Sequence, residues 1–142
     1  QYLQMAQRMD LPAVLGYIDL DDLKWVNDNF GHPAGDQALI DTATILKDTF
    51  RSADILARIG GDEFVILSLV SASQTGEQML TRVHNALTAF NARSDRRFAL
   101  SLSMGIARCE PKTPVLLSAL LEAADRSMYA QKQAKKSVIR AG

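Results

Sequence analysis

Two short apolar segments separated by a Gly-Gly pair constrain the fold of this chain more than any other feature. Residues Ile55–Arg58 and Glu63–Leu69 flank a four-residue linker that contains Gly60 and Gly61. Tight hairpin turns use backbone conformations with positive φ, which glycine adopts without steric cost. We therefore expect two adjacent antiparallel strands joined by a turn at these glycines.

The remaining sequence alternates between strand-like and helix-like patterns. Apolar runs indicate further strands at residues 14–20 and 98–107, and a last short strand at 138–139. Helical spacing of apolar residues indicates helices at residues 1–9, 21–30, 33–50, 75–92 and 116–135, the last with an inward face from Leu117 to Met128. This order predicts an α/β (α+β) fold, with a mixed, mostly antiparallel central sheet of about five strands flanked by helices.

The composition indicates one globular domain without a strong charge. The 142 residues include 16 basic and 16 acidic side chains. A polyanion-binding protein usually carries a basic excess, so we expect no nucleic acid polymer as a partner and phosphate binding by a few local groups. No apolar run has the length of a membrane span, so we expect no membrane contact by this domain. Cys109, the only cysteine, is expected at a strand end or in a loop of a cytoplasmic protein, because it cannot form an internal disulfide.

Acidic residues stand at the ends of two predicted strands. Asp19 closes the first strand, and Asp62 and Glu63 follow the two glycines. If the first strand lies beside the hairpin, these three carboxylates meet at one edge and repel one another unless cations neutralise them. Hard oxygen ligands of this kind suit Mg²⁺ or Mn²⁺. The alternative is a solvated hairpin with a polar tip, and we interpret the neighbouring Asp21 and Asp22 as helix N-caps.

Six motifs at fixed spacing carry a resemblance to a known family. Five are residues 18–28, 30–32, 35–36, 58–64 and 103–107, and the sixth combines the pairs 124–125 and 128–129. In this order they resemble the GGDEF domain of diguanylate cyclases, over nearly the whole chain. The resemblance implies a palm-like sheet related to nucleotide cyclases and polymerases. It also implies that residues 1–142 are a single GGDEF domain, truncated at its N-terminus and part of a larger signalling protein, which can itself be membrane-anchored.

The resemblance implies a metal-dependent active site. It assigns metal binding to Asp19, Glu63 and the Leu20 carbonyl, and both catalysis and metal binding to Asp62. Two Mg²⁺ or Mn²⁺ ions per site would activate an attacking oxygen and stabilise a leaving one.

The same resemblance implies positions that bind GTP. They are Leu23, Lys24, Asn27, Asp36, Gly60, Gly61, Lys132 and Lys136. Asn27 and Asp36 would bind the guanine edge, because an amide both donates and accepts hydrogen bonds and a carboxylate accepts them. Outside this pattern, Asn27 would be interpreted as a helix-end cap and Asp36 as a surface charge.

Arg51 and Asp54 form an R-x-x-D motif, and five residues separate this motif from Gly60. On its own such a motif indicates a surface ion pair. The resemblance identifies it as an inhibitory site for the product cyclic di-GMP, which Arg82 completes from a neighbouring domain in some family members.

The resemblance therefore predicts a diguanylate cyclase that condenses two GTP into cyclic di-GMP and pyrophosphate as a homodimer. The alternative is an inactive module that binds GTP or cyclic di-GMP and regulates an adjoining domain. One departure favours the alternative: the family's Gly-Arg-Asn after the last helix is replaced by Lys135, Lys136 and Ser137.

Overall fold

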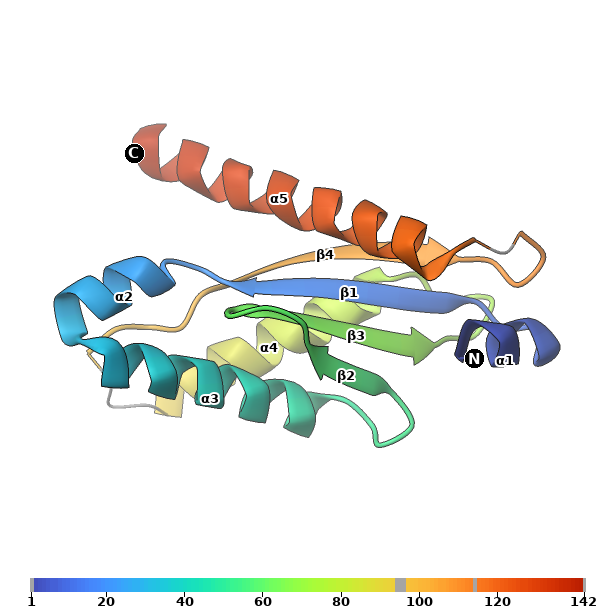
Figure 1. Cartoon of the computed structure of the whole chain (residues 1–142), viewed down its shortest axis with the longest axis horizontal. Coiled ribbons are helices and arrows are strands. Elements are labelled where there is room, and N and C mark those ends of the chain that lie inside the picture. The colour runs from blue at the N-terminus through green and yellow to red at the C-terminus, as the bar shows by residue number, and fades with distance from the viewer. Residues whose placement is uncertain (1, 94–96, 114, 142) are drawn as a thin grey trace.

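The computed structural model describes residues 2–93, 97–113 and 115–141 and contains one sheet with helices on both faces (Figure 1). The elements in chain order are α1 (Tyr2–Arg8), β1 (Ala13–Leu20), α2 (Leu23–Phe30), α3 (His32–Thr49), β2 (Ile55–Arg58), β3 (Glu63–Leu69), α4 (Glu77–Arg93), β4 (Leu102–Cys109) and α5 (Leu117–Ala141). None of the described helices is long and apolar enough to span a membrane.

The sheet has four strands in the order β2-β3-β1-β4. All three pairings are antiparallel, and β1 lies between β3 and β4 with Asp19 opposite Glu63 on one side and Ser103 on the other. The predicted hairpin of β2 and β3 is confirmed, and so is the α+β class. Cys109 is buried at the end of β4, as the sequence predicted.

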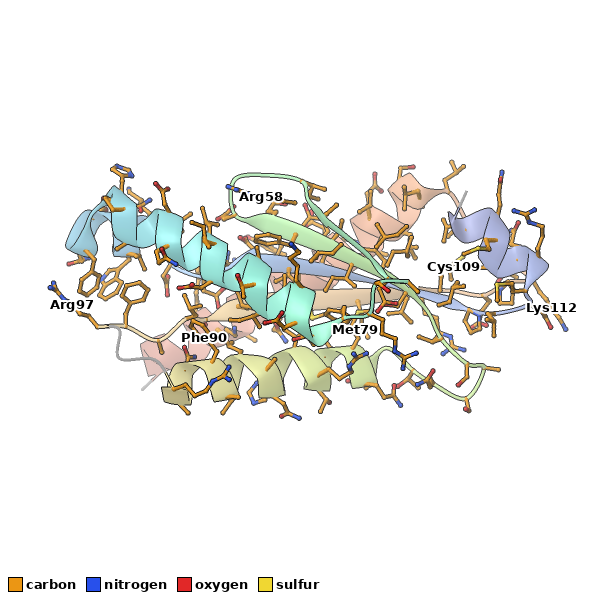
Figure 2. All side chains as sticks on the ribbon, turned by 90° about the horizontal axis from the view of Figure 1, so that it is seen from below. Arg58, Met79, Phe90, Arg97, Cys109 and Lys112 are labelled. Carbon is orange, nitrogen blue, oxygen red and sulfur yellow. The ribbon has the colours of Figure 1, made fainter. Side chains whose placement is uncertain are left out.

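Alternation along β1 divides the core between two layers. Val14 and Ile18 face α3 and α4 on one side of the sheet, whereas Leu15 and Tyr17 face α5 on the other. Seen from below, α3 and α4 run side by side across their face (Figure 2). Both layers bury apolar side chains, which is the main stabilising contribution to the fold.

Helix α5 packs against β4 at a glycine. A Cβ atom added at Gly105 would lie 2.1 Å from the backbone nitrogen of Met128 and 2.2 Å from the carbonyl oxygen of Ala124. Only a residue without a side chain allows this approach, so Gly105 sets the distance between α5 and the sheet.

Two strand predictions were wrong. Residues 138–139 lie within α5, which continues to Ala141, so the described residues form four strands and not the predicted five. Residues 135–141 contain neither glycine nor proline, and two β-branched residues alone do not end a helix. The strand predicted from residue 98 begins at Leu102, because the Asn91 side chain binds both the amide and the carbonyl of Leu100, each at 2.9 Å.

Other details also differ from prediction. The sheet is wholly antiparallel among the described strands, not mixed. Leu117 is 48% exposed, because α5 begins there, before its packed face, which starts at Leu120. Within the described backbone, Gly31 is the glycine with positive φ (90°), so the Gly60-Gly61 turn forms without the left-handed conformation that we expected.

Candidate functional site

The edge where β1 ends and β3 begins brings together the acidic residues predicted from the sequence. Asp19 and Glu63 are partners in the antiparallel pairing, so their side chains project to the same face, the face that α5 covers. Asp62 lies in the turn just before β3, and its carbonyl oxygen accepts a hydrogen bond from the Leu20 amide at 3.1 Å. The turn is therefore joined to the end of β1.

Arg58 holds the Gly60-Gly61 turn. Its Nε donates to the Gly60 carbonyl at 3.2 Å and to the Gly61 carbonyl at 3.1 Å, and its Nη2 donates to the Gly61 carbonyl at 2.5 Å. A Cβ atom added at Gly61 would meet no atom within 4 Å. The turn is thus fixed on its inner side and open on its outer side, where a ligand can approach the backbone.

The Asp19 side chain is 14% exposed, and one of its two carboxylate oxygens is fully buried. Its Oδ2 accepts a hydrogen bond from Lys132 Nζ at 2.6 Å, whereas its Oδ1 is buried with no partner among the described residues. Burial raises the pKa of the Asp19 carboxyl to about 6, the Lys132 hydrogen bond opposes this rise, and the neighbouring Asp62 adds to it. A cation at Oδ1 would offset both the cost of burying the carboxylate charge and its repulsion by Asp62.

Glu63 has a partner that the sequence analysis missed. The Tyr17 hydroxyl donates a hydrogen bond to Glu63 Oε2. Burial raises the pKa of Tyr17 above its usual value, and the hydrogen bond to Glu63 raises it further. The signal was present in the strand alternation, because Tyr17 stands two residues before Asp19 and so shares its face.

The three carboxylates are neighbours but are not arranged as a set of ligands. Among the described residues, no three His, Cys, Asp or Glu side chains surround a common point. Lys132 is bound to Asp19, and Tyr17 is bound to Glu63. Metal binding by Asp19, Leu20, Asp62 and Glu63 therefore stays a prediction.

Asp21 does not act as the predicted helix cap. Its carboxylate accepts hydrogen bonds from Ser101 and Ser103 at 2.7 Å each and from Lys135 at 2.8 Å. Burial raises the pKa of Asp21, but the hydrogen bond from Lys135 and those from the serines outweigh it and hold the pKa below its usual value. Asp22 occupies the N-cap position of α2 with φ 60° and forms no side-chain cap, so the cap interpretation was wrong for both residues.

The residues expected to bind guanine lie on α2 and α3, beyond the end of β1 (Figure 1). Asn27 packs so closely on Gly35 that an added Cβ would lie 1.8 Å from Asn27 Oδ1. The backbone carbonyl of Asn27, and not its side chain, accepts the hydrogen bond from Gly31 at the end of α2. Asp36 and Lys24 are exposed and Leu23 is half-buried, so their expected role stays a prediction.

Basic side chains of α5 surround a small cavity beside this edge. Its volume is about 80 Å³, and Lys132, Lys135 and Lys136 line it together with Asp21, Asp22 and Ser101. Burial lowers the pKa of Lys132, but the hydrogen bond with Asp19 outweighs burial and raises it. Lys132 is thus firmly cationic next to the acidic edge.

Arg51, Asp54 and Arg82 line one larger cavity of about 590 Å³. Asp54 Oδ2 accepts a hydrogen bond from the Arg51 amide at 3.0 Å, which fixes the R-x-x-D turn. Arg82 donates to the Thr49 carbonyl at 2.5 Å, and its guanidinium lies over the Phe50 ring, 5.1 Å from the centroid. Arg82 therefore lines this cavity together with Arg51 and Asp54 of the same chain, and its contribution to a neighbouring domain's site stays a prediction.

Comparison with known proteins identifies the class. The chain matches the family described as "Diguanylate cyclase, GGDEF domain" over residues 1–138. The protein belongs to the GGDEF family, as the motif resemblance predicted.

Curated relatives are longer proteins of the same family. The probable diguanylate cyclase DgcC of Escherichia coli strain K12 is 30% identical over 131 residues, which are 92% of this chain and 35% of that protein. The diguanylate cyclase DgcP of Pseudomonas aeruginosa is 36% identical over 123 residues, which are 85% of this chain and 18% of that protein. The chain spans about a third or less of the length of these relatives.

Solved GGDEF structures share the fold. The GGDEF domain of DgcB from Caulobacter crescentus, in complex with c-di-GMP, superposes with a TM-score of 0.78 at 25% identity and covers 92% of this chain and 77% of its own. A sensory box/GGDEF family protein from Caulobacter crescentus superposes with a TM-score of 0.81 at 28% identity and covers 94% and 86%. These matches confirm the predicted fold class.

Proposed function

We propose that this domain is a diguanylate cyclase that joins two GTP molecules into cyclic di-GMP and pyrophosphate. The observation that carries the proposal is the acidic edge, where the buried Oδ1 of Asp19 has no partner within the described part of the chain. Asp19 lies opposite Glu63 in the strand pair, next to an open glycine turn. Membership of the GGDEF family agrees with it, and so does the c-di-GMP bound to the related DgcB domain.

The acidic edge suits Mg²⁺ or Mn²⁺. We assign Asp19, Glu63, Asp62 and the Leu20 carbonyl as the groups that would hold two such ions, because hard cations take carboxylate and carbonyl oxygens. When bound, the ions supply Lewis-acid polarisation of phosphoryl oxygens and activation of a hydroxyl. The Asp19 carboxyl, whose pKa burial raises, is the group that a cation would stabilise most.

GTP would lie between the acidic edge and the two helices beyond it. Asn27, held in place by Gly35, and Asp36 would bind the guanine edge. Leu23, Gly60 and Gly61 would contact the nucleotide, since the turn leaves its backbone open. Lys24, Lys132 and Lys136 would neutralise triphosphate oxygens as point charges.

Reaction would require two domains, because one domain holds one GTP. The 3′-hydroxyl oxygen of one GTP forms a bond to the α-phosphorus of the other, the bond from that phosphorus to the pyrophosphate oxygen breaks, and the hydroxyl proton is released. A second such step closes the ring. The homodimer, GTP as substrate and a cytoplasmic location all belong to this proposal. Alignment of the two nucleotides would supply much of the rate.

The 590 Å³ cavity is the site that we propose for product inhibition. Arg51 and Arg82 present guanidinium groups that can bind a guanine edge, and Asp54 can accept from the base. Cyclic di-GMP would then be both the product and the inhibitor of the domain.

The second candidate is a module that binds GTP or cyclic di-GMP without turnover and regulates an adjoining domain. Two observations favour it. Lys132 occupies one oxygen of Asp19. Lys136 stands where the family pattern has arginine, and a lysine cannot bind phosphate through two parallel hydrogen bonds.

A turnover assay separates the two candidates. The domain would be fused to a coiled coil that forces dimers, supplied with GTP and Mg²⁺, and its product compared with cyclic di-GMP by chromatography. We expect cyclic di-GMP from the fusion, none from Glu63→Ala or Asp62→Ala, and full activity from Glu122→Ala, which changes an exposed acid of α5. Activity retained in Glu63→Ala would refute the metal assignment, and a folded, dimeric, inactive fusion would support the binding module.

A further inference from the structure

Helix α5 is held to the sheet in two different ways along its length. Its first half is packed by the buried side chains of Leu120, Ala124 and Met128. From residue 129 to residue 136 no described side chain is buried, and only Lys132 and Lys135 are even half-buried. The half of the helix that carries the basic residues therefore depends on polar contacts for its position.

Three side chains, spaced so that they share one face of α5, make these contacts. Gln131 Oε1 accepts a hydrogen bond from the Met104 amide at 2.6 Å. Lys132 Nζ donates to Asp19 at 2.6 Å. Lys135 Nζ donates to Asp21 at 2.8 Å and to the Leu102 carbonyl.

The two short ion pairs, Lys132–Asp19 and Lys135–Asp21, differ in what substrate binding would do to them. The Lys132–Asp19 pair uses two groups that the proposed function gives to phosphate and metal, so it must be rearranged when substrate enters. The Lys135–Asp21 pair uses neither, and it would remain as the polar anchor of this half of α5. Lys132 Nζ also lies 3.9 Å from Asp21 Oδ1, so Asp21 faces both lysines.

Asp21 is built as a fixed acceptor. Its side chain is only 9% exposed. Ser101 and Ser103 hold its two carboxylate oxygens from β4 and the segment before it. Lys135, by contrast, is 40% exposed and reaches down to Asp21 from the helix.

We propose that Asp21 and Lys135 are positioning residues that keep the C-terminal half of α5 over the end of β1, so that Lys132 stays within reach of the substrate phosphates. The inference rests on the proposed function for its readout in nucleotide affinity, but the anchoring of α5 can be measured without nucleotide. Losing either partner removes the charged contact between α5 and the end of β1 and loosens α5.

A direct role of Lys135 in binding phosphate predicts the opposite change in nucleotide affinity for Asp21→Asn. If Lys135 itself bound the nucleotide, Asp21→Asn would free it and tighten binding. If Lys135 positions α5, Asp21→Asn and Lys135→Met both weaken binding. Their effects in the double variant are less than additive, because both remove the Lys135–Asp21 contact.

The experiment measures binding of a non-hydrolysable GTP analogue with Mg²⁺ by calorimetry, together with amide hydrogen exchange of residues 129–136 without nucleotide. Four proteins are compared with the unmodified domain: Lys135→Met, Asp21→Asn, the double variant and Lys135→Arg. Lys112→Met is the matched control, because Lys112 is exposed in the loop before α5. This loop lies at the end of the molecule opposite the C-terminal end of α5 (Figures 1 and 2).

We expect about tenfold weaker binding and faster exchange in both single variants and the double variant, recovery in Lys135→Arg, and no change in Lys112→Met. Tighter binding by Asp21→Asn, or unchanged exchange in Lys135→Met, would overturn the inference. If the unmodified domain binds no GTP analogue, the proposed function fails, and the exchange measurement alone still decides whether this pair anchors α5.

Discussion

Adding one methyl group at Gly105 tests the contact that places α5 on the sheet. The Cβ of Gly105→Ala would lie 2.1 Å from Met128 N and 2.2 Å from the Ala124 carbonyl oxygen, both backbone atoms of α5. Cβ atoms essentially never lie within 3.0 Å of such an atom and make ordinary contact from 3.4 Å, so β4 and α5 must separate by about 0.9 to 1.3 Å. Neither atom is the end of a flexible side chain, so the whole helix has to move.

This separation weakens the packing of Leu120, Ala124 and Met128 against the sheet. A gap of about 1 Å removes up to half of the dispersion energy at each contact. We expect the free energy of unfolding to fall by about 3 kcal/mol, the upper part of the range for overpacked cores. The measurement is urea denaturation of both proteins, followed by far-ultraviolet circular dichroism.

Gly61→Ala is the matched control for this change. An added Cβ there would meet no atom within 4 Å, so we expect the free energy of unfolding to change by less than about 0.5 kcal/mol. Equal stabilities of Gly105→Ala and Gly61→Ala would refute the claim that Gly105 sets the position of α5.

Three further changes test other parts of the site. Gly35→Ala would push Asn27 aside, because the new Cβ would lie 1.8 Å from its Oδ1, so we expect guanine nucleotide affinity to fall about tenfold in calorimetry. Arg58→Met removes the hydrogen bonds to the Gly60-Gly61 turn, and we expect turnover to fall about tenfold while thermal stability changes little, since Arg58 is exposed. Arg82→Ala should weaken cyclic di-GMP binding at the 590 Å³ cavity without lowering turnover at low cyclic di-GMP concentration. Equal inhibition of the variant and the unmodified domain by cyclic di-GMP would contradict the assignment of this cavity as the inhibitory site.

The sequence predicted those parts of the fold that local patterns determine. Ile55–Arg58 and Glu63–Leu69 form the expected hairpin, and Asp19 meets Glu63 because both stand at the ends of paired strands. The last helix was more difficult, because two β-branched residues near its end suggested a strand while nothing in the sequence stopped the helix.

Contacts between residues far apart in the chain could not be predicted from local sequence patterns. Asp21 was interpreted as a cap because its true partners, Ser101, Ser103 and Lys135, lie far away in the chain. Local propensity says nothing about such pairs, since they arise only when the strands and α5 come together. The same holds for Asn91, whose side chain binds Leu100 and delays the start of β4.

The central claim is that the ends of β1 and β3 form a divalent-metal and nucleotide site. Binding of Mn²⁺ in the presence of a non-hydrolysable GTP analogue, followed by electron paramagnetic resonance, tests it most directly. We predict saturable binding of about two ions per domain, lost in Asp19→Asn and Glu63→Gln and kept in Glu122→Gln. Unchanged Mn²⁺ binding by Asp19→Asn would contradict the account.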